Sequence, residues 1–295
     1  MSDPLTPAAR ALCDAMSAGF PGPGDADALR AAARAGVRDV PASRETTAHG
    51  VRVRLYGPDP DADPTAVPAP VVVFAHGGGW VLCDLDTHDA LCRELAARTG
   101  ASVVSVDYRR APEHRFPAAE DDVYTVLEWA AARYGGPLFL AGDSSGGNLA
   151  AAAALRARDA GGPQVAGQLL FYPVLDHRLD SVSADAYAEG FFHTTAHMRW
   201  YWEQYLGPAG EPVAASPGLA PDLTGLPPTL LVLADCDLLR DEGLAYARRL
   251  SAAGVQAQVH LHTGVFHGFL GARGVLPEAE NALAGAAAWV ATVSG

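Results

Sequence analysis

A serine lies between two glycines at the point where an apolar segment meets an alanine-rich one. Residues 142–146 read Gly-Asp-Ser-Ser-Gly. The apolar residues 138–141 before this motif predict a buried strand, and the alanine-rich residues 148–158 after it predict a helix. A serine on a sharp strand-to-helix turn takes a strained backbone conformation that exposes its hydroxyl above the sheet. Glycine and serine also fill ordinary turns, but this context predicts that Ser144 is a nucleophile.

A histidine that could activate this serine comes later in the chain. A serine hydroxyl is a poor nucleophile until a base takes its proton and a third group orients that base. Of the ten histidines, His267 follows the predicted strand 256–261, at the expected C-terminal edge of the sheet. It also follows Ser144 and an aspartate, in a Ser–Asp–His order known for serine nucleophiles on α/β folds. We therefore predict that His267 is the general base.

Three aspartates follow the predicted strand 229–234 and compete for the orienting role. Asp241 is placed to cap the next helix, which is a structural role. Asp235 is nearest to the strand, where neighbouring backbone could hold it. Asp237 lies in the loop with room to reach an imidazole. We therefore choose Asp237 and keep Asp235 as the alternative.

A glycine-rich segment, His76-Gly77-Gly78-Gly79-Trp80, directly follows the predicted strand 71–75. Three glycines allow backbone N–H groups to approach a ligand without interference from side chains. Such donors stabilise the negative charge that develops during acyl transfer, by about 3–4 kcal/mol per donor in known cases. A phosphate-binding loop is the alternative, but the sequence has no G-x-x-x-x-G-K motif. The N–H group of Ser145 would supply a third donor.

Together, these segments resemble the hormone-sensitive-lipase-like esterases, also called bacterial family IV, within the α/β-hydrolases. The matching motifs are spread from about Val51 to the C-terminus: HGGGW at 76–80, DYRRAPEH at 107–114, GDSSGG at 142–147, DLLRDEG at 237–243 and FHGF at 266–269. Two positions depart from the family pattern. Ser145 stands where many members have alanine, which should leave the backbone donor intact, and Leu238 stands where proline is common.

The resemblance implies a site and a division of the chain. The site would comprise Ser144 as nucleophile, Asp237 as orienting acid, His267 as base, and the N–H groups of Gly78, Gly79 and Ser145 as oxyanion hole. A cap would be formed by residues 1–45 and by an insertion at residues 177–212. The catalytic core would then comprise residues 46–176 and 213–295.

The remaining patterns predict an α/β fold, with a mostly parallel central sheet flanked by helices. Short β-branched or leucine-rich segments alternate with helical patterns, and they occupy 51–56, 71–75, 102–106, 138–141, 168–172, 229–234 and 256–261. Helical patterns begin at Thr6-Pro7 and at Asp25, ahead of the first strand. The interval 176–212 breaks the alternation and is rich in aromatic residues. It predicts a helical insertion whose rings mostly pack inward.

The charged segment 108–114 follows a predicted strand beside the proposed site. A catalytic arginine or a catalytic Glu113 is one interpretation. We favour ion pairing that fixes this loop, because polar groups near the site need partners. His260 and His262 would share one face of a strand, but no third metal ligand is evident, so we expect no metal site.

The composition argues against several classes of protein. A chain of 295 residues with 49% hydrophobic residues can bury a substantial core, which argues against disorder. The net charge of −13 argues against nucleic acid or anionic lipid as a partner. No secretory signal or long apolar segment is evident, so we expect a cytoplasmic protein without stable membrane association. The four cysteines form no C-x-x-C pair and are expected to be free, mostly buried thiols.

These inferences predict a carboxylesterase that hydrolyses short acyl esters through an acyl-enzyme on Ser144, without a cofactor. Short chains are expected because a cap and the bulky Trp80, Phe192 and Phe269 would bound a compact pocket, with Leu238 as a further substrate contact. The alternatives are a natural-product tailoring deacetylase, or a non-hydrolytic enzyme or ligand-binding protein on the same fold. A homodimer through the last predicted strand stays open.

Overall fold

The computed structural model describes residues 3–37, 40, 43–59, 68–208 and 212–295. The strands are β1 (Arg44–Ala48), β2 (Val51–Tyr56), β3 (Val71–Ala75), β4 (Ser102–Val106), β5 (Leu138–Asp143), β6 (Val165–Phe171), β7 (Thr229–Cys236) and β8 (Ala257–Phe266). The α-helices are α1 (Pro7–Ala18), α2 (Ala26–Arg34), α3 (Asp89–Thr99), α4 (Ala118–Arg133), α5 (Ser145–Ala160), α6 (Val182–Ala186), α7 (Thr195–Leu206), α8 (Arg240–Ala252) and α9 (Pro277–Ser294). None of the helices within these ranges is long and apolar enough to cross a bilayer.

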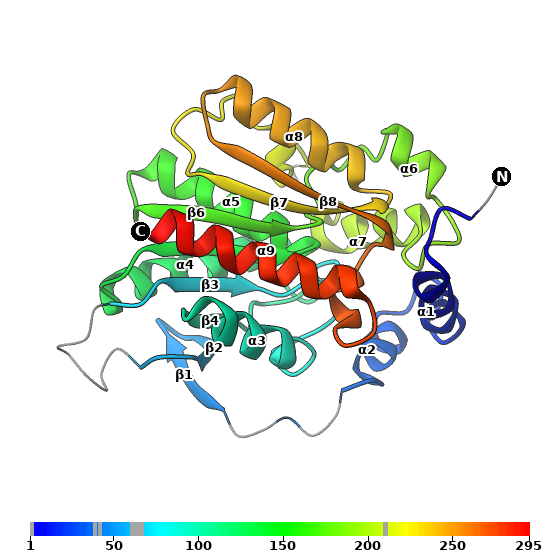
Figure 1. Ribbon diagram of the computed structural model, residues 1–295, viewed down its shortest axis with the longest axis horizontal. Helices are drawn as coiled ribbons and strands as arrows, with labels where there is room; N and C mark the ends of the chain where they lie inside the picture. The colour runs from blue at the N-terminus through cyan, green and yellow to red at the C-terminus, as the bar shows by residue number, and fades with distance from the viewer. Residues whose placement is uncertain (1–2, 38–39, 41–42, 60–67, 209–211) are drawn as a thin grey trace.

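Within the described residues, eight strands form one sheet in the order β1-β2-β4-β3-β5-β6-β7-β8 (Figure 1). The pairs β1–β2 and β2–β4 are antiparallel, and all later pairs are parallel. Strands β3, β4 and β5 are buried along their whole length. Helices α4, α5 and α8 pack in one hydrophobic core, whereas α3 and α9 pack in a second one. The sheet is therefore covered on both faces, which confirms the predicted fold class.

Two elements were absent from the sequence prediction. Strand β1 exposes four of its five residues, so it carries no hydrophobic periodicity. Helix α3 buries Leu91, Cys92 and Leu95 and ends at Gly100, which adopts a left-handed conformation with φ of 68°. Strand β8 extends beyond the predicted strand to Phe266 and forms an edge of the sheet, as expected. Its pairing with a second copy stays a prediction.

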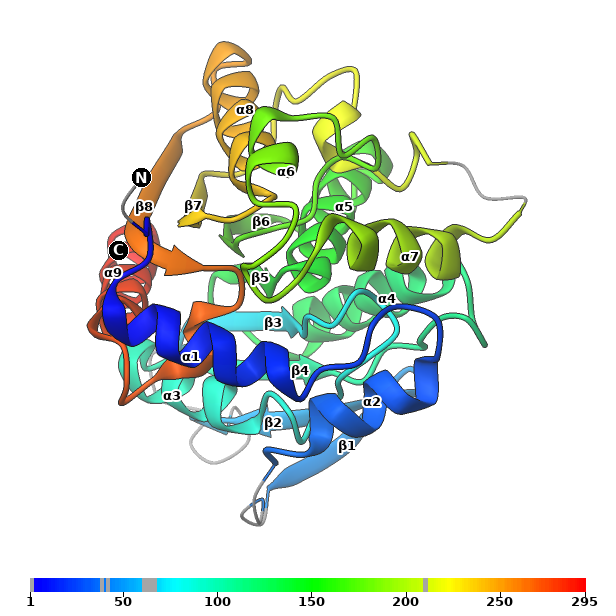
Figure 2. The ribbon, with the colours of Figure 1, turned by 90° about the vertical axis from the view of Figure 1, so that its right-hand side faces the viewer.

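Helices α1 and α2 lie at the C-terminal ends of the parallel strands, on the same side of the molecule as α6 and α7 of the insertion (Figure 2). The side chain of Thr6 caps α1 by accepting the N–H of Ala9, as the sequence indicated. The backbone N–H of Thr6 donates to Gly264 O at 2.9 Å, which joins α1 to β8. Arg10 Nη1 donates to Gly190 O at 2.7 Å, which joins α1 to the insertion. Residues 209–211 of the predicted insertion lie outside the described residues.

Helix α2 packs on the core through the buried side chain of Leu29, and its Arg34 pairs with Asp86 at 3.0 Å. Arg30 makes a further set of hydrogen bonds. Its guanidinium donates to Val81 O and Ala111 O, each at 2.9 Å, and to the carboxylate of Glu113 at 2.7 Å. Glu113 is therefore an ion-pairing residue, as favoured from the sequence, although its partner comes from the N-terminal segment. The hydrogen bond from Arg30 is the main reason why the pKa of Glu113 falls from 4.5 to about 2. The ion pair is therefore complete above pH 4.5 and is lost as the pH falls through about 2.

We expect Arg30→Ala to weaken the attachment of α2 by about 1–2 kcal/mol, because several charge-assisted hydrogen bonds on a partly exposed side chain are lost. Hydrogen exchange at neutral pH should show faster exchange in α2, with unchanged exchange in β3 and β5. Arg248→Ala is the matched control, because Arg248 is an exposed arginine of α8 without a hydrogen bond or ion pair to the described residues. Equal exchange of α2 in both variants would contradict this role of Arg30.

Candidate active site

Ser144 occupies the sharp turn between β5 and α5. Its backbone has φ of 55° and ψ of −120°, a conformation that L-residues rarely adopt. The Ser144 N–H donates to Phe171 O on β6 at 2.9 Å, which holds the turn. A Cβ atom on Gly146 would lie 2.0 Å from Ala75 O, and one on Gly142 would lie 2.3 Å from Gly146 O. Both positions therefore require glycine, because strand and helix backbones touch there.

The structure brings Ser144, His267 and Asp237 into one hydrogen-bonded chain. His267 Nε2 lies 2.9 Å from Ser144 Oγ, and His267 Nδ1 lies 2.8 Å from Asp237 Oδ2. Asp237 is only 1% exposed, and its other oxygen accepts the N–H of Leu239 at 2.9 Å. An acceptor at Nδ1 fixes the proton on that nitrogen, which leaves Nε2 free to take a proton from the serine.

The two competing aspartates hold neighbouring segments instead. Asp235 Oδ1 accepts the N–H of Gly264 at 2.8 Å, which ties β7 to the end of β8. Asp241 does not cap α8, contrary to the prediction, because the helix begins one residue earlier, at Arg240. Its carboxylate instead accepts the N–H of Ser183 at 3.0 Å, which ties α8 to α6. Neither aspartate has a hydrogen bond to His267.

The glycine-rich loop after β3 presents two free backbone donors. The N–H of Gly77 donates to Asp143 Oδ1 at 2.8 Å, and the N–H of Trp80 donates to Ser145 Oγ at 3.1 Å. Between them, the N–H groups of Gly78 and Gly79 have no acceptor among the described residues. Gly79 also needs to be glycine, because a Cβ atom would lie 2.3 Å from the ring of Tyr201. The serine hydroxyl at position 145 thus holds the loop, a role that the sequence did not indicate.

A buried polar network lies behind this loop, and sequence reasoning did not identify it, although several of its members belong to the motifs. His88 Nε2 lies 3.2 Å from Asp143 Oδ1, and Tyr108 Oη donates to His76 O at 2.8 Å. Burial opposes ionisation of Asp143, but His88 and the N–H of Gly77 together lower its pKa. Burial lowers the pKa of His76 to about 3, so this imidazole is neutral. The network therefore provides an anionic carboxylate that fixes Gly77 beside Ser144.

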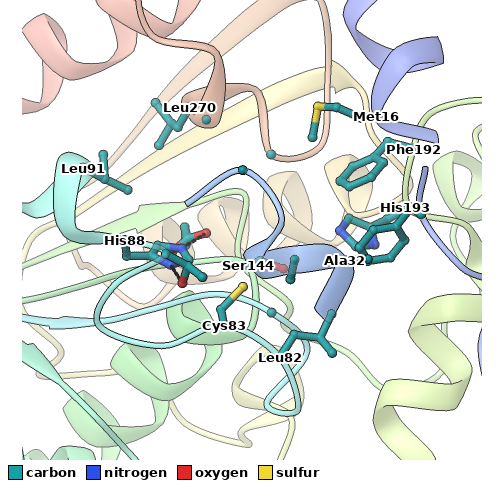
Figure 3. A pocket seen from close by; sticks show the side chains of 18 of the residues that line it. Met16, Ala32, Leu82, Cys83, His88, Leu91, Ser144, Phe192, His193 and Leu270 are labelled. Carbon is teal, nitrogen blue, oxygen red and sulfur yellow. Dashed lines mark hydrogen bonds and ion pairs between the residues drawn. The ribbon is translucent and has the colours of Figure 1, made fainter. Parts of the chain in front are cut away.

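A cavity of about 870 Å³ opens above Ser144 (Figure 3). Its wall combines residues of the core with Met16 of α1, Ala32 of α2 and Phe192 of the insertion. This volume lies at the upper end of the range for small-molecule sites, about 300–1,000 Å³. The cavity is therefore larger than the compact pocket expected from the sequence.

Of the four predicted substrate contacts, only Phe192 lines this cavity. Trp80 is fully buried and stacks on Tyr205 with ring centroids 4.3 Å apart. Phe269 is also fully buried, and Leu238 is 2% exposed. Trp80 and Phe269, which were expected to bound the pocket, are core residues instead, because an apolar side chain beside a site residue can equally point away from the site.

Comparison with known proteins agrees with this geometry. The family described as alpha/beta hydrolase fold matches residues 72–271. Esterase LipI of Mycobacterium tuberculosis is 43% identical over 249 residues, which cover 79% of this chain and 75% of LipI. Ethyl acetate hydrolase of Pseudomonas putida is 35% identical over 246 residues, covering 80% of this chain and 76% of that protein. The gibberellin receptor GID1 of Oryza sativa is 38% identical over 215 residues, covering 66% of this chain and 60% of the receptor.

A solved structure matches nearly the whole chain. The hyperthermophilic esterase of the archaeon Pyrobaculum calidifontis superposes with a TM-score of 0.90 at 36% identity, covering 98% of this chain and 99% of the other. The fold and the serine site define an α/β hydrolase. Within that superfamily, the chain belongs to the hormone-sensitive-lipase-like esterases. It is a serine carboxylesterase that acts on small-molecule esters.

We expect Asp237→Asn to lower kcat by a factor on the order of 10⁴, because the amide would no longer hold His267 in the required tautomer. Asp235→Asn is the matched control, since it changes the neighbouring carboxylate that bonds Gly264. Turnover of p-nitrophenyl acetate should be measured for both variants, with folding matched by circular dichroism. A larger loss of kcat in Asp235→Asn would show that the wrong aspartate has been chosen.

Proposed function

We propose that this carboxylesterase hydrolyses short acyl esters through an acyl-enzyme formed on Ser144. One observation carries the proposal: the hydrogen-bonded chain Asp237–His267–Ser144 lies beside a loop with two unpartnered N–H groups. This arrangement supplies a nucleophile, a base, an orienting carboxylate and an electrophilic site, which together are sufficient for acyl transfer.

In the first half of the reaction, His267 Nε2 takes the hydroxyl proton of Ser144 while Oγ attacks the ester carbonyl carbon. The N–H groups of Gly78, Gly79 and Ser145 donate to the oxyanion that forms. His267 then gives its proton to the leaving alcohol, and the acyl-enzyme remains. In the second half, His267 takes a proton from water, which attacks the acyl carbon. The bond from that carbon to Ser144 Oγ then breaks, His267 returns the proton to Oγ, and the acid is released. Asp237 stays ionised and stabilises the imidazolium in both halves.

The preference for short acyl chains draws on the relatives rather than on the volume of the cavity. The Pseudomonas putida relative is named for ethyl acetate, an ester with a short acyl group. We also propose that α1, α2 and the insertion form the cap, because Phe20 and Phe192 meet at 5.1 Å between ring centroids and both line the cavity. The cytoplasmic location and the homodimer stay predictions.

A ligand-binding role is the second candidate, because one relative is a gibberellin receptor. Binding alone does not require a base oriented by a buried carboxylate, whereas Asp237 and His267 retain that arrangement. A tailoring deacetylase would use the same residues and the same chemistry, so it differs only in the substrate. Turnover of simple esters therefore separates the receptor from both enzymes.

We expect Ser144→Ala to lower turnover of p-nitrophenyl esters by a factor on the order of 10⁴–10⁶ while the fold is retained. Wild type should release a burst of p-nitrophenol as the acyl-enzyme accumulates, and turnover should fall as the acyl chain lengthens from acetate to laurate. Ser251→Ala is the matched control on exposed α8 surface. A Ser144→Ala enzyme with more than about a tenth of wild-type turnover would overturn the assignment.

A further inference from the structure

Two polar side chains from the insertion line the cavity near Ser144 without a hydrogen-bond partner. They are His193, which follows Phe192, and Tyr201 of α7. The ring centroids of His193 and Tyr201 are 6.0 Å apart. The mechanism proposed above uses neither side chain, so their polar atoms call for a separate explanation.

The His193 side chain is half-buried, with other rings on several sides. It meets the edge of His267 with centroids 5.6 Å apart and an interplanar angle of 82°, and it also contacts Phe20 and His197. His193 Nδ1 is buried, and the imidazole has no hydrogen bond to the described residues. Burial lowers the pKa of His193 well below its usual value, and the neighbouring His267 and His197 lower it further. The imidazole is thus neutral, with one N–H donor and one acceptor nitrogen.

Tyr201 presents a second unsatisfied group at the same wall. Its side chain is 1% exposed and its hydroxyl is buried without a partner. The ring lies directly over Gly79 of the glycine-rich loop, since a Cβ atom there would touch it. His193 contacts the ring of His267, whereas Tyr201 covers the loop with the free N–H donors. The pair therefore spans the space above the position that a scissile ester would occupy.

The unpartnered polar atoms of His193 and Tyr201 affect which substrates the site accepts. A buried polar group without a partner is energetically costly, and water in an empty cavity can relieve that cost. A plain alkyl substituent that displaces the water leaves the imidazole and hydroxyl unpaired. A substituent with an oxygen atom pairs with them. A site built around polar groups strongly rejects an analogue that lacks the matching polar group. An apolar pocket rejects an analogue that carries an added hydroxyl group much less strongly.

We propose that His193 and Tyr201 form a polar subsite that binds an oxygen-bearing substituent of the substrate close to the scissile ester, such as an ether, hydroxyl or keto oxygen. This inference rests on the proposed function and narrows its substrate class. The enzyme accordingly selects oxygen-substituted esters over alkyl esters of the same length. His193 and Tyr201 act on specificity, whereas Ser144, His267 and Asp237 perform the chemistry.

The test compares esters of matched shape in matched enzymes. On the acyl side, p-nitrophenyl methoxyacetate is compared with p-nitrophenyl butyrate, in which a methylene replaces the ether oxygen. On the alcohol side, 2-methoxyethyl acetate is compared with n-butyl acetate. For each pair, the ratio of kcat/KM for ether over alkyl ester is measured in wild type, His193→Phe and Tyr201→Phe. Comparing the ratio between enzymes cancels the different intrinsic reactivities of the esters.

We expect the ratio to fall about tenfold in His193→Phe for at least one pair, and by a smaller factor in Tyr201→Phe, which removes a single oxygen atom. His262→Phe is the matched control, because His262 also has a buried unpartnered nitrogen and a ring neighbour, Phe269, but does not line the cavity. Its ratio should equal that of wild type. Thermal melting followed by circular dichroism establishes that each variant is folded.

The outcomes separate this inference from the function on which it rests. A wild type that hydrolyses none of these esters would overturn both. If wild type hydrolyses these esters but its ratio of kcat/KM equals that of His193→Phe and Tyr201→Phe, only the polar subsite is overturned. Should His193→Phe fail to fold, an unchanged ratio in Tyr201→Phe would by itself overturn the pair. An equal fall of the ratio in His262→Phe would also count against it.

Discussion

The active site depends on one strained residue. Ser144 is held at positive φ, a conformation that costs about 1–3 kcal/mol and persists only when the surroundings determine it. The surroundings here are backbone atoms of three parallel strands, β3, β5 and β6. Phe171 O on β6 accepts the N–H of Ser144, and Ala75 O on β3 lies directly against Gly146. Because no side chain could be accommodated at these contacts, the turn, the start of α5 and the end of β3 form one rigid unit. That unit fixes where the serine hydroxyl lies.

The same turn also positions the glycine-rich loop, because the residues on either side of Ser144 form hydrogen bonds to the loop. Asp143 accepts the N–H of Gly77, and Ser145 accepts the N–H of Trp80. These bonds occupy the donors that flank Gly78 and Gly79, so the two free N–H groups are aligned relative to Ser144 by its own neighbours. Such alignment before substrate arrives removes the cost of reorganisation during the reaction. The charge on Asp143 strengthens its bond to Gly77, and His88 Nε2 lies 3.2 Å from the same carboxylate.

The parts of this site that the sequence predicted are those fixed by strand ends. Ser144, Asp237 and His267 each follow a parallel strand, and parallel strands end at one edge of the sheet, so chain order and distance from a strand were sufficient. The side chains of Trp80, Leu238 and Phe269 could not be placed in this way, because proximity along the chain does not determine whether a side chain points to the cavity or to the core. Likewise, β1 is short and exposed, and α3 has only a weak apolar face, so neither produced a clear periodic signal.

Chemistry and selectivity are thereby assigned to different parts of the fold. The proposed catalytic residues Ser144, Asp237 and His267 are buried at the ends of core strands, where local opening is costly. The residues that shape the cavity, such as Met16, Phe20 and Phe192, come from α1, the segment after it and the insertion, which meet the core through a few hydrogen bonds such as those of Arg30 and Thr6. We expect substitutions there to change which ester fits without disturbing the strained turn. The residues that line the cavity can therefore vary while the residues at the strand ends stay in place. A large cavity with unsatisfied polar atoms in its wall is consistent with that division.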